Sequence, residues 1–218
     1  MKYDTLIFDL DGTLLNTLED LCDSLNEVLL QEGYMPRTLD EVRRFVGNGV
    51  RRLVEQSLPD ETGDDEINRI TSLFQQYYKN NMQNKTKPYD GIMELLYDLK
   101  RHKYKIAIVS NKFDSATKAL ARHFFNGLID VAIGETAQIR KKPAPDSIYK
   151  AVGELGSDIA KAILVGDSET DIDTAKNAGI PCIGVSWGFR GRRLLEKYGA
   201  DYIIDSPDEL INLIRSIT

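Results

Sequence analysis

Two carboxylates stand one residue apart at the end of an apolar run near the start of the chain. Residues 6–15 read LIFDLDGTLL, so Asp9 and Asp11 adjoin side chains that favour burial. An unpaired carboxylate in an apolar interior is costly, and such groups are normally paired, metal-bound or protonated. Two explanations are open at this point. Either the pair marks the solvated end of a strand, or a positive group lies beside it.

Other polar residues follow further apolar runs. Residues 110–112 (SNK) come after KIAIV, residues 167–171 (DSETD) come after AILVG, and the loop RKKPAPD presents Lys141 and Lys142. Taken singly, these residues read as a turn, a helix cap and solvated lysines. In open parallel sheets, however, ligands bind beyond the carboxyl ends of the strands. Carboxylates crowded at that edge repel one another unless a cation holds them, and oxygen ligands without histidine favour Mg²⁺.

The elements that must position these residues alternate along most of the chain. Short apolar runs predict buried strands at residues 3–10, 105–111, 130–134, 162–167, 181–188 and 201–205. Helical patterns lie between them at residues 92–103, 115–125, 147–155 and 171–178. This alternation predicts an α/β fold: a Rossmann-like, mostly parallel sheet flanked by helices on both faces.

Residues 17–84 break the alternation and show helical spacing only. Helices are expected from Thr17 to Gly33 and over residues 38–46, 50–58 and 65–82. Thr17 and Asp20 match a capping-box pattern, and Gly33 suits the end of that helix. We therefore predict a core domain of residues 1–15 and 86–218 with an all-helical cap domain, residues 16–85, inserted after the first strand. The segments LLNT and NKTKPYDG read as hinge linkers.

Composition excludes several classes of protein. The 218 residues allow one large domain or a core with a smaller one, and 28 basic against 34 acidic side chains give a net charge of −6. No basic stretch suggests a nucleic-acid partner, and the N-terminal segment has no signal peptide or membrane anchor. Cys22 and Cys182 stand far apart, as is typical of reduced thiols in a cytoplasmic protein. No coiled-coil pattern is present, so we expect a monomer.

The sequence resembles the haloacid dehalogenase superfamily of phosphotransferases. The resemblance rests on DLDGT, VSN, KKP and GDSETD, four motifs in order along the whole chain, each following a predicted strand. It implies that Asp9 is the nucleophile of an aspartyl-phosphate mechanism and that Asp11 is the general acid and base. Mg²⁺ would bind the carboxylates of Asp9 and Asp167 and the backbone carbonyl of Asp11. Asp171 would be a further ligand or would fix metal-bound water.

The same resemblance assigns residues to the phosphate. Ser110 and nearby groups of Gly12 and Asn111 would bind the phosphoryl oxygens. Lys142, the second lysine of KKP, would neutralise charge on both the phosphate and Asp9.

The segment FVGNGVRRLVEQSL, residues 45–58, resembles the cap loop of bacterial phosphoglycolate phosphatases. Gly47 and Asn48 would present backbone amides to an anion, and Arg51 or Arg52 would pair with a substrate carboxylate. Alternatively, the glycines only form a tight turn and the arginines face solvent. The implied function is a Mg²⁺-dependent phosphomonoester hydrolase acting on a small phosphorylated metabolite, with 2-phosphoglycolate as the first candidate.

Three alternatives stay open. A phosphosugar mutase of the β-phosphoglucomutase type shares all four motifs, and inorganic pyrophosphate is another candidate substrate. A non-catalytic phosphoryl-accepting switch, such as a receiver domain, also combines a phosphorylated aspartate with nearby acids and a Lys-Pro pair. Receivers, however, lack the inserted helices and the second carboxylate two residues after the acceptor.

Overall fold

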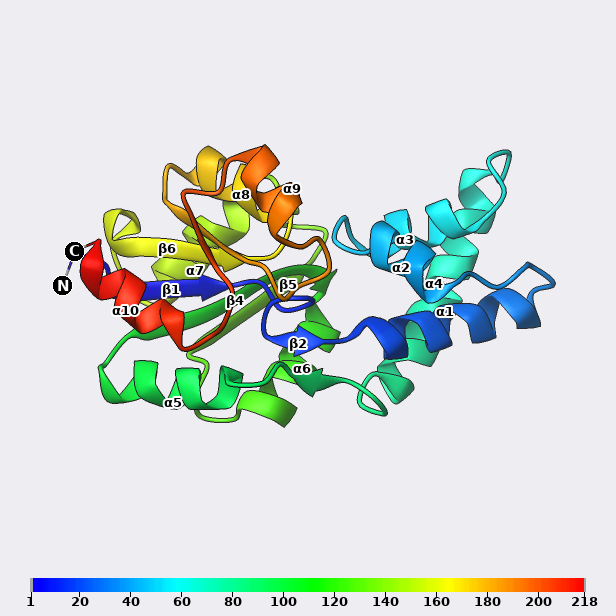
Figure 1. The fold of residues 1–218 in the computed structure, drawn as a ribbon. Coiled ribbons are helices and arrows are strands. Elements are labelled where there is room, and N and C mark those ends of the chain that lie inside the picture. Colours follow the sequence, from blue (N-terminus) through cyan, green and yellow to red (C-terminus); the bar gives the residue numbers. More distant parts are fainter. Residues whose placement is uncertain (1, 218) are drawn as a thin grey trace.

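A six-stranded parallel sheet forms the centre of the molecule. The computed structural model describes residues 2–217, and Figure 1 shows the sheet, whose strand order is β5-β4-β1-β6-β7-β8. The strands are β1 (Thr5–Phe8), β4 (Lys105–Phe113), β5 (Val131–Glu135), β6 (Ala162–Gly166), β7 (Cys182–Val185) and β8 (Tyr202–Ile204). Each lies within a few residues of a predicted apolar run, and the predicted α/β class is confirmed.

Helices cover both faces of this sheet. They are α5 (Ile92–Arg101), α6 (Asp114–Phe125), α7 (Asp146–Glu154), α8 (Glu169–Ala178), α9 (Arg192–Tyr198) and α10 (Glu209–Ser216), with a 3₁₀ turn at Ile159–Lys161. In β1, Leu6 and Phe8 pack in the hydrophobic cluster of α5, α6 and α10, whereas Ile7 packs in the cluster of α7, α8 and α9. Both faces of the strand are therefore buried, which explains the unbroken apolar run in the sequence.

Four helices form the cap, which lies beyond the carboxyl end of β1 at the right of Figure 1. They are α1 (Leu18–Gln31), α2 (Leu39–Phe45), α3 (Val50–Ser57) and α4 (Asp64–Asn81). Helices α1 and α4 pack together through buried residues spaced three or four apart, which place them on one face of each helix. These residues are Leu21, Leu25 and Leu29 of α1 and Ile67, Ile70 and Phe74 of α4.

The two segments that join the cap to the core pair with each other. Leu15–Asn16 (β2) runs antiparallel to Lys87–Pro88 (β3) and forms a separate two-stranded sheet. The sequence patterns predict irregular linkers here, because strands of two residues are too short to show a period. The linkers are therefore held side by side at the junction of cap and core.

The capping box predicted at the start of α1 is wrong. The Thr17 side chain makes no capping hydrogen bond, and its Oγ1 donates instead to Asp11 Oδ1 at 2.7 Å. Asp20 is buried and accepts hydrogen bonds from the backbone N–H groups of Lys85 at 2.9 Å and Thr86 at 2.8 Å. Contacts across the junction between cap and core thus take both side chains away from the helix terminus.

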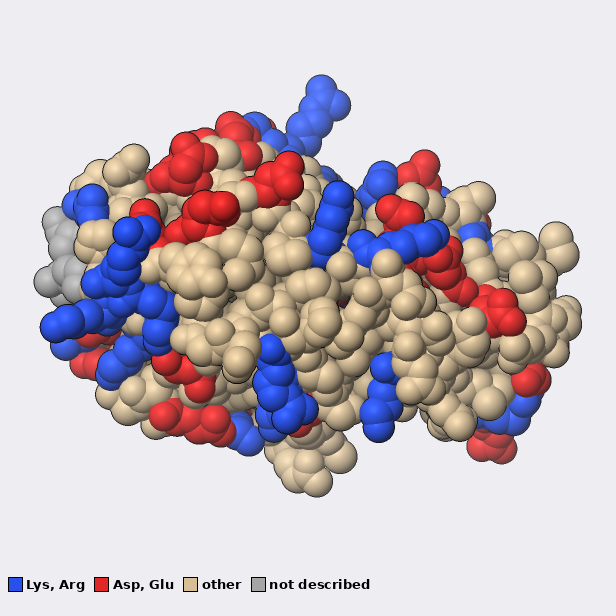
Figure 2. Space-filling model, turned by 90° about the horizontal axis from the view of Figure 1, so that it is seen from below, with Lys and Arg blue, Asp and Glu red and all other residues tan. Residues whose placement is uncertain are grey.

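No helix within residues 2–217 is long and apolar enough to cross a membrane. On the face shown in Figure 2, acidic and basic side chains are interspersed over both the core and the cap.

Candidate active site

Asp9 lies just beyond β1, where polar residues from several strand ends meet. Its backbone N–H donates to the carbonyl of Val165 at 2.9 Å, which fixes its place beside β6. Its Oδ1 accepts a hydrogen bond from Lys142 Nζ at 2.8 Å, and both side chains are almost fully buried. Burial raises the pKa of Asp9 to about 7, although the Lys142 ammonium opposes this shift.

Asn111 fixes the loop that carries Lys142. Asn111 Oδ1 accepts from the backbone N–H of Lys142 at 2.8 Å, and Asn111 Nδ2 donates to the Lys142 carbonyl at 3.0 Å. Nδ2 also donates to the carbonyl of Gly47 in the cap at 3.0 Å. The Asn111 amide, which we expect to bind phosphate, thus holds Lys142 and the cap in this structure.

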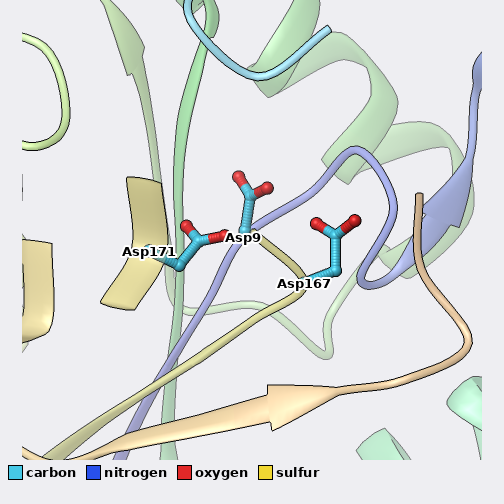
Figure 3. Close-up of side chains that lie close together, drawn as sticks. All are labelled: Asp9, Asp167 and Asp171. Atoms are coloured by element: carbon cyan, nitrogen blue, oxygen red, sulfur yellow. The ribbon is translucent and has the colours of Figure 1, made fainter. Parts of the chain in front are cut away.

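Asp9, Asp167 and Asp171 form a buried acidic cluster, shown in Figure 3. One carboxylate oxygen of each lies within 4.8 Å of the other two. Lys142 Nζ, already bonded to Asp9, also donates to Asp171 Oδ1 at 2.6 Å. Burial and the charges of Asp171 and Asp9 raise the pKa of Asp167 well above its usual range. Among the described ion pairs, the Lys142 ammonium therefore serves Asp9 and Asp171, whereas Asp167 Oδ2 accepts from the backbone N–H of Phe189 at 2.7 Å.

This cluster fits a hard divalent cation. It offers carboxylate oxygens only, which are the ligands that Mg²⁺ prefers, and a cation would relieve their mutual repulsion. The backbone at Gly12 has a φ of +88°, and a Cβ there would lie 2.5 Å from Asp167 Oδ2. Glycine therefore lets the Asp9–Asp11 turn approach Asp167 closely. The residues present could hold a metal ion.

Asp171 also caps a helix. Its Oδ2 accepts from the backbone N–H of Ser168 at 3.1 Å and its backbone N–H donates to Ser168 Oγ at 3.4 Å, which forms a capping box at the start of α8. Asp171 therefore both caps α8 and contacts Lys142. The cap uses Oδ2 of its carboxylate, and the contact with Lys142 uses Oδ1.

Asp11 is held separately from the cluster. Its Oδ1 accepts from Thr17 Oγ1 at 2.7 Å and from Lys112 Nζ at 2.9 Å, and its Oδ2 accepts from Lys112 Nζ at 3.0 Å. The Lys112 side chain is 2% exposed. No sequence pattern assigned a role to Lys112. Its position directly after Ser110 and Asn111 is the feature of the sequence that could have indicated a place in the site.

A cavity of about 540 Å³, counted with its opening to solvent, lies between core and cap. The core lines it with Asp9, Asp11, Ser110, Asn111, Lys112, Asp167, Ser168, Phe189 and Arg190. The cap lines it with Leu21, Val46, Gly47, Gly49, Val50 and Leu53. The core thus contributes the charged side chains, and the cap contributes mostly apolar surface.

Core side chains hold the cap loop, residues 46–49, in place. Arg190 donates from Nη1 to the carbonyl of Arg43 and from Nη2 to the carbonyl of Val46, both at 2.6 Å. Lys141 Nζ donates to the carbonyl of Asn48 at 2.9 Å. Sequence reasoning assigned no role to Arg190, because backbone carbonyls leave no signature in the sequence.

Arg51 and Arg52 do not line the described cavity. Arg51 forms an ion pair with Asp64 and donates from Nε to Asn68 Oδ1 at 3.2 Å. Arg52 pairs with Glu55 at 2.8 Å. In this structure both guanidinium groups are bound to cap residues. This agrees with the alternative in which the arginines face solvent and do not pair with a substrate carboxylate.

Comparison with known proteins identifies the family. The family model described as haloacid dehalogenase-like hydrolase matches residues 6–185. The chain belongs to the haloacid dehalogenase-like hydrolases. The phosphoglycolate phosphatase of Mesorhizobium japonicum is 34% identical over 205 residues, which cover 90% of this chain and 88% of that protein. Pyrophosphatase PpaX of Bacillus cereus is 30% identical and covers 100% of this chain and 99% of its own.

Two solved structures have the same architecture. A phosphoglycolate phosphatase candidate from Lactobacillus delbrueckii subsp. bulgaricus superposes with a TM-score of 0.90 at 37% identity, covering 96% of this chain and 97% of that one. CbbY from Rhodobacter sphaeroides, in complex with phosphate, gives 0.79 at 26% identity, covering 95% and 96%. With the curated relatives, these likenesses identify the protein as a phosphatase of this family.

Proposed function

We propose that this phosphatase is Mg²⁺-dependent and hydrolyses 2-phosphoglycolate through an aspartyl-phosphate on Asp9. The observation that carries the mechanism is the buried group of Asp9, Lys142 and the acidic cluster, with Asp11 beside it at the cavity. The relatives named phosphoglycolate phosphatases support the choice of substrate, because the likeness extends over about nine-tenths of the chain.

In the first step, an Asp9 carboxylate oxygen attacks phosphorus, and the bond from phosphorus to the leaving oxygen breaks. Lys142 lies 2.8 Å from the attacking carboxylate and lowers the repulsion between two anions. Asp11 donates a proton to the leaving oxygen, so that the alcohol and not the alkoxide departs. The products of this step are glycolate and phosphorylated Asp9.

In the second step, Asp11 takes a proton from a water molecule whose oxygen attacks phosphorus. The Asp9–phosphorus bond breaks, phosphate is released and the Asp9 carboxylate is restored. Ser110 lines the same cavity and is suited to donate its hydroxyl proton to a phosphoryl oxygen. Asp9, which forms the covalent intermediate, and Asp11, which exchanges the proton, therefore complete the cycle without a further acid.

The carboxylates of Asp9 and Asp167 would hold Mg²⁺ together with the backbone carbonyl of Asp11. Asp171 would act as a ligand or orient bound water, since its Oδ1 is shared with Lys142. The bound ion supplies positive charge against the phosphate and the acidic cluster.

Pyrophosphate is the second candidate substrate, because PpaX matches the whole chain. The two substrates differ in their leaving groups: pyrophosphate loses a phosphate, whereas 2-phosphoglycolate loses an alcohol that carries a carboxylate. Phosphate release from both compounds, from β-glucose 1-phosphate and from p-nitrophenyl phosphate separates these possibilities.

The assay runs with Mg²⁺ and with EDTA, on the wild type and on Asp9→Asn. Asp208→Asn is the matched control, because that carboxylate lies exposed at the start of α10 and makes no capping hydrogen bond. We expect selective, metal-dependent release from 2-phosphoglycolate that Asp9→Asn abolishes and Asp208→Asn retains. Selective phosphate release from pyrophosphate would make pyrophosphate the proposed substrate and leave the proposed mechanism unchanged. Full activity of Asp9→Asn would reject the mechanism.

A further inference from the structure

Lys112 is a buried cation at the end of β4. Its Nζ lies 2.9 Å and 3.0 Å from the two carboxylate oxygens of Asp11. Tyr78, from cap helix α4, covers the ammonium with its ring centroid 4.6 Å from Nζ. A buried charge is strongly destabilising unless it is paired. The Asp11 carboxylate and the aromatic face of Tyr78 together offset this cost.

The two buried lysines of the site serve different carboxylates. Lys142 bonds to Asp9 and Asp171, whereas the ion pair of Lys112 is with Asp11. Lys112 thus forms, with Asp11, a unit separate from the acidic cluster.

The two oxygens of Asp11 are unequally bonded. Oδ1 accepts from both Thr17 and Lys112, whereas Oδ2 accepts from Lys112 alone among the described hydrogen bonds. A carboxylate oxygen can accept about two hydrogen bonds, so Oδ2 keeps capacity for a further partner. Asp11 lines the cavity, so a substrate or a water molecule there can take the remaining place on Oδ2.

We propose that Lys112 is a positioning residue that turns Asp11 Oδ2 toward the leaving oxygen of the substrate, and that Tyr78 of the cap keeps Lys112 in place. The inference rests on the proposed function, in which Asp11 exchanges the proton. While Asp11 carries the proton, Lys112 keeps the Tyr78 ring and the neutral carboxyl group as partners. Oδ2 gives this proton to the leaving oxygen as the phosphorus–oxygen bond breaks and the Asp9–phosphorus bond forms, which restores the pair of carboxylate and ammonium. Asp11 is left as a carboxylate beside the ammonium, and Lys112 neither gains nor loses a proton.

Lys112→Met tests this role through its dependence on the leaving group. The p-nitrophenolate of p-nitrophenyl phosphate departs readily without a proton, whereas the more basic phenolate of phenyl phosphate needs one. The two esters are similar in shape, and neither carries a carboxylate. We expect kcat/KM to fall about 100-fold for phenyl phosphate and less than about tenfold for p-nitrophenyl phosphate.

Lys118→Met is the matched control. Lys118 lies on α6 with its side chain 53% exposed, so this variant should keep the kcat/KM of both esters. Because kcat/KM covers only the steps up to the departure of the leaving group, hydrolysis of the aspartyl-phosphate does not enter the comparison.

Equal losses of Lys112→Met on the two aryl esters would overturn the proposal, because Lys112 would then support the fold or phosphoryl transfer in general. A loss confined to 2-phosphoglycolate would overturn it too, since Lys112 would then bind the substrate carboxylate. If the wild type hydrolyses aryl esters but not 2-phosphoglycolate, the proposed substrate fails and the test of Lys112 still stands.

The double variant Asp11→Asn/Lys112→Met covers the case in which the single variant fails to fold. It replaces both partners by neutral side chains, so no buried charge is left unpaired. If Lys112 acts only through Asp11, the double variant should match Asp11→Asn within about twofold on both esters. A further tenfold loss would contradict the proposal.

Discussion

The core and the cap enclose one cavity but contribute different chemistry to it. On the core side, charged groups are buried in pairs, with Lys142 at 2.8 Å from Asp9 and Lys112 at 2.9 Å from Asp11. On the cap side, the lining is apolar side chains and glycine backbone, while Arg51 pairs with a cap carboxylate away from the cavity. The proposed reacting groups thus lie at the ends of core strands, and the cap contributes the apolar part of the cavity lining.

The energetic costs differ in the same way. Exposed ion pairs such as those of α3 contribute about 0–1 kcal/mol each, so the cap could lose them without consequence. Burying the core lysines and carboxylates is costly, and such pairs are often no more stabilising than apolar residues of the same size. Their presence just beyond β1, at the end of β4 and in the loop between β5 and α7 therefore indicates function rather than stability.

The largest expected effect is the difference in kcat/KM between Asp9→Asn in the core and Arg51→Ala in the cap. We expect kcat/KM to fall at least about 10⁴-fold in the core variant, because the nucleophile is lost. The cap variant should stay within about threefold of the wild type, because it breaks only a surface ion pair. Steady-state assays on 2-phosphoglycolate check both. A loss above about 100-fold in Arg51→Ala would break the comparison and assign substrate recognition to the cap.

Metal binding sharpens the comparison, because the cluster of three carboxylates found within residues 2–217 belongs to the core. Burial raises the pKa of Asp9 from an ordinary 3.8 to about 7 in the folded state. Between these two values the folded protein binds more protons than the unfolded chain, so without a cation its stability falls as pH rises through this window. A divalent cation binds the ionised cluster, so Mg²⁺ should stabilise more at pH 8 than at pH 5.

Thermal unfolding with Mg²⁺ and with EDTA measures this effect. At a concentration 100-fold above Kd, stabilisation of about 2.7 kcal/mol should raise Tm by roughly 5–10 °C at pH 8. Asp167→Asn should remove most of the shift. An equal shift at both pH values, or one that survives in Asp167→Asn, would place the metal elsewhere.

The smallest effect concerns Arg190, the core side chain that holds the cap loop. Arg190→Met removes three hydrogen bonds to cap carbonyls, while Lys141 and Asn111 still contact the loop. We expect KM to rise about tenfold, because the arrangement in which the cap loop contacts the core is less populated. We expect kcat to change less than about threefold. Arg193→Met, at an exposed position of α9, is the control. A fall in kcat with KM unchanged would instead link Arg190 to the chemical step.

The positions of the core residues could be predicted because polar residues directly after apolar strands are visible in the sequence. Asp9 and Asp167 follow neighbouring parallel strands, so their meeting at one edge of the sheet follows from topology. The capping box at Thr17 failed because a tertiary partner, Asp11, competed for the hydroxyl. The contact of Arg190 with the cap could not be predicted, since its cap partners are backbone carbonyls more than a hundred residues away.

The most direct test of the account is to find the phosphoryl group on Asp9. Wild type and Asp11→Asn are quenched in acid during turnover of p-nitrophenyl phosphate with Mg²⁺, and their peptides are analysed by mass spectrometry. The account predicts a phosphoryl adduct on Asp9 that accumulates further in Asp11→Asn, because its hydrolysis lacks the base. No adduct in either protein, together with turnover retained in Asp9→Asn, would contradict it.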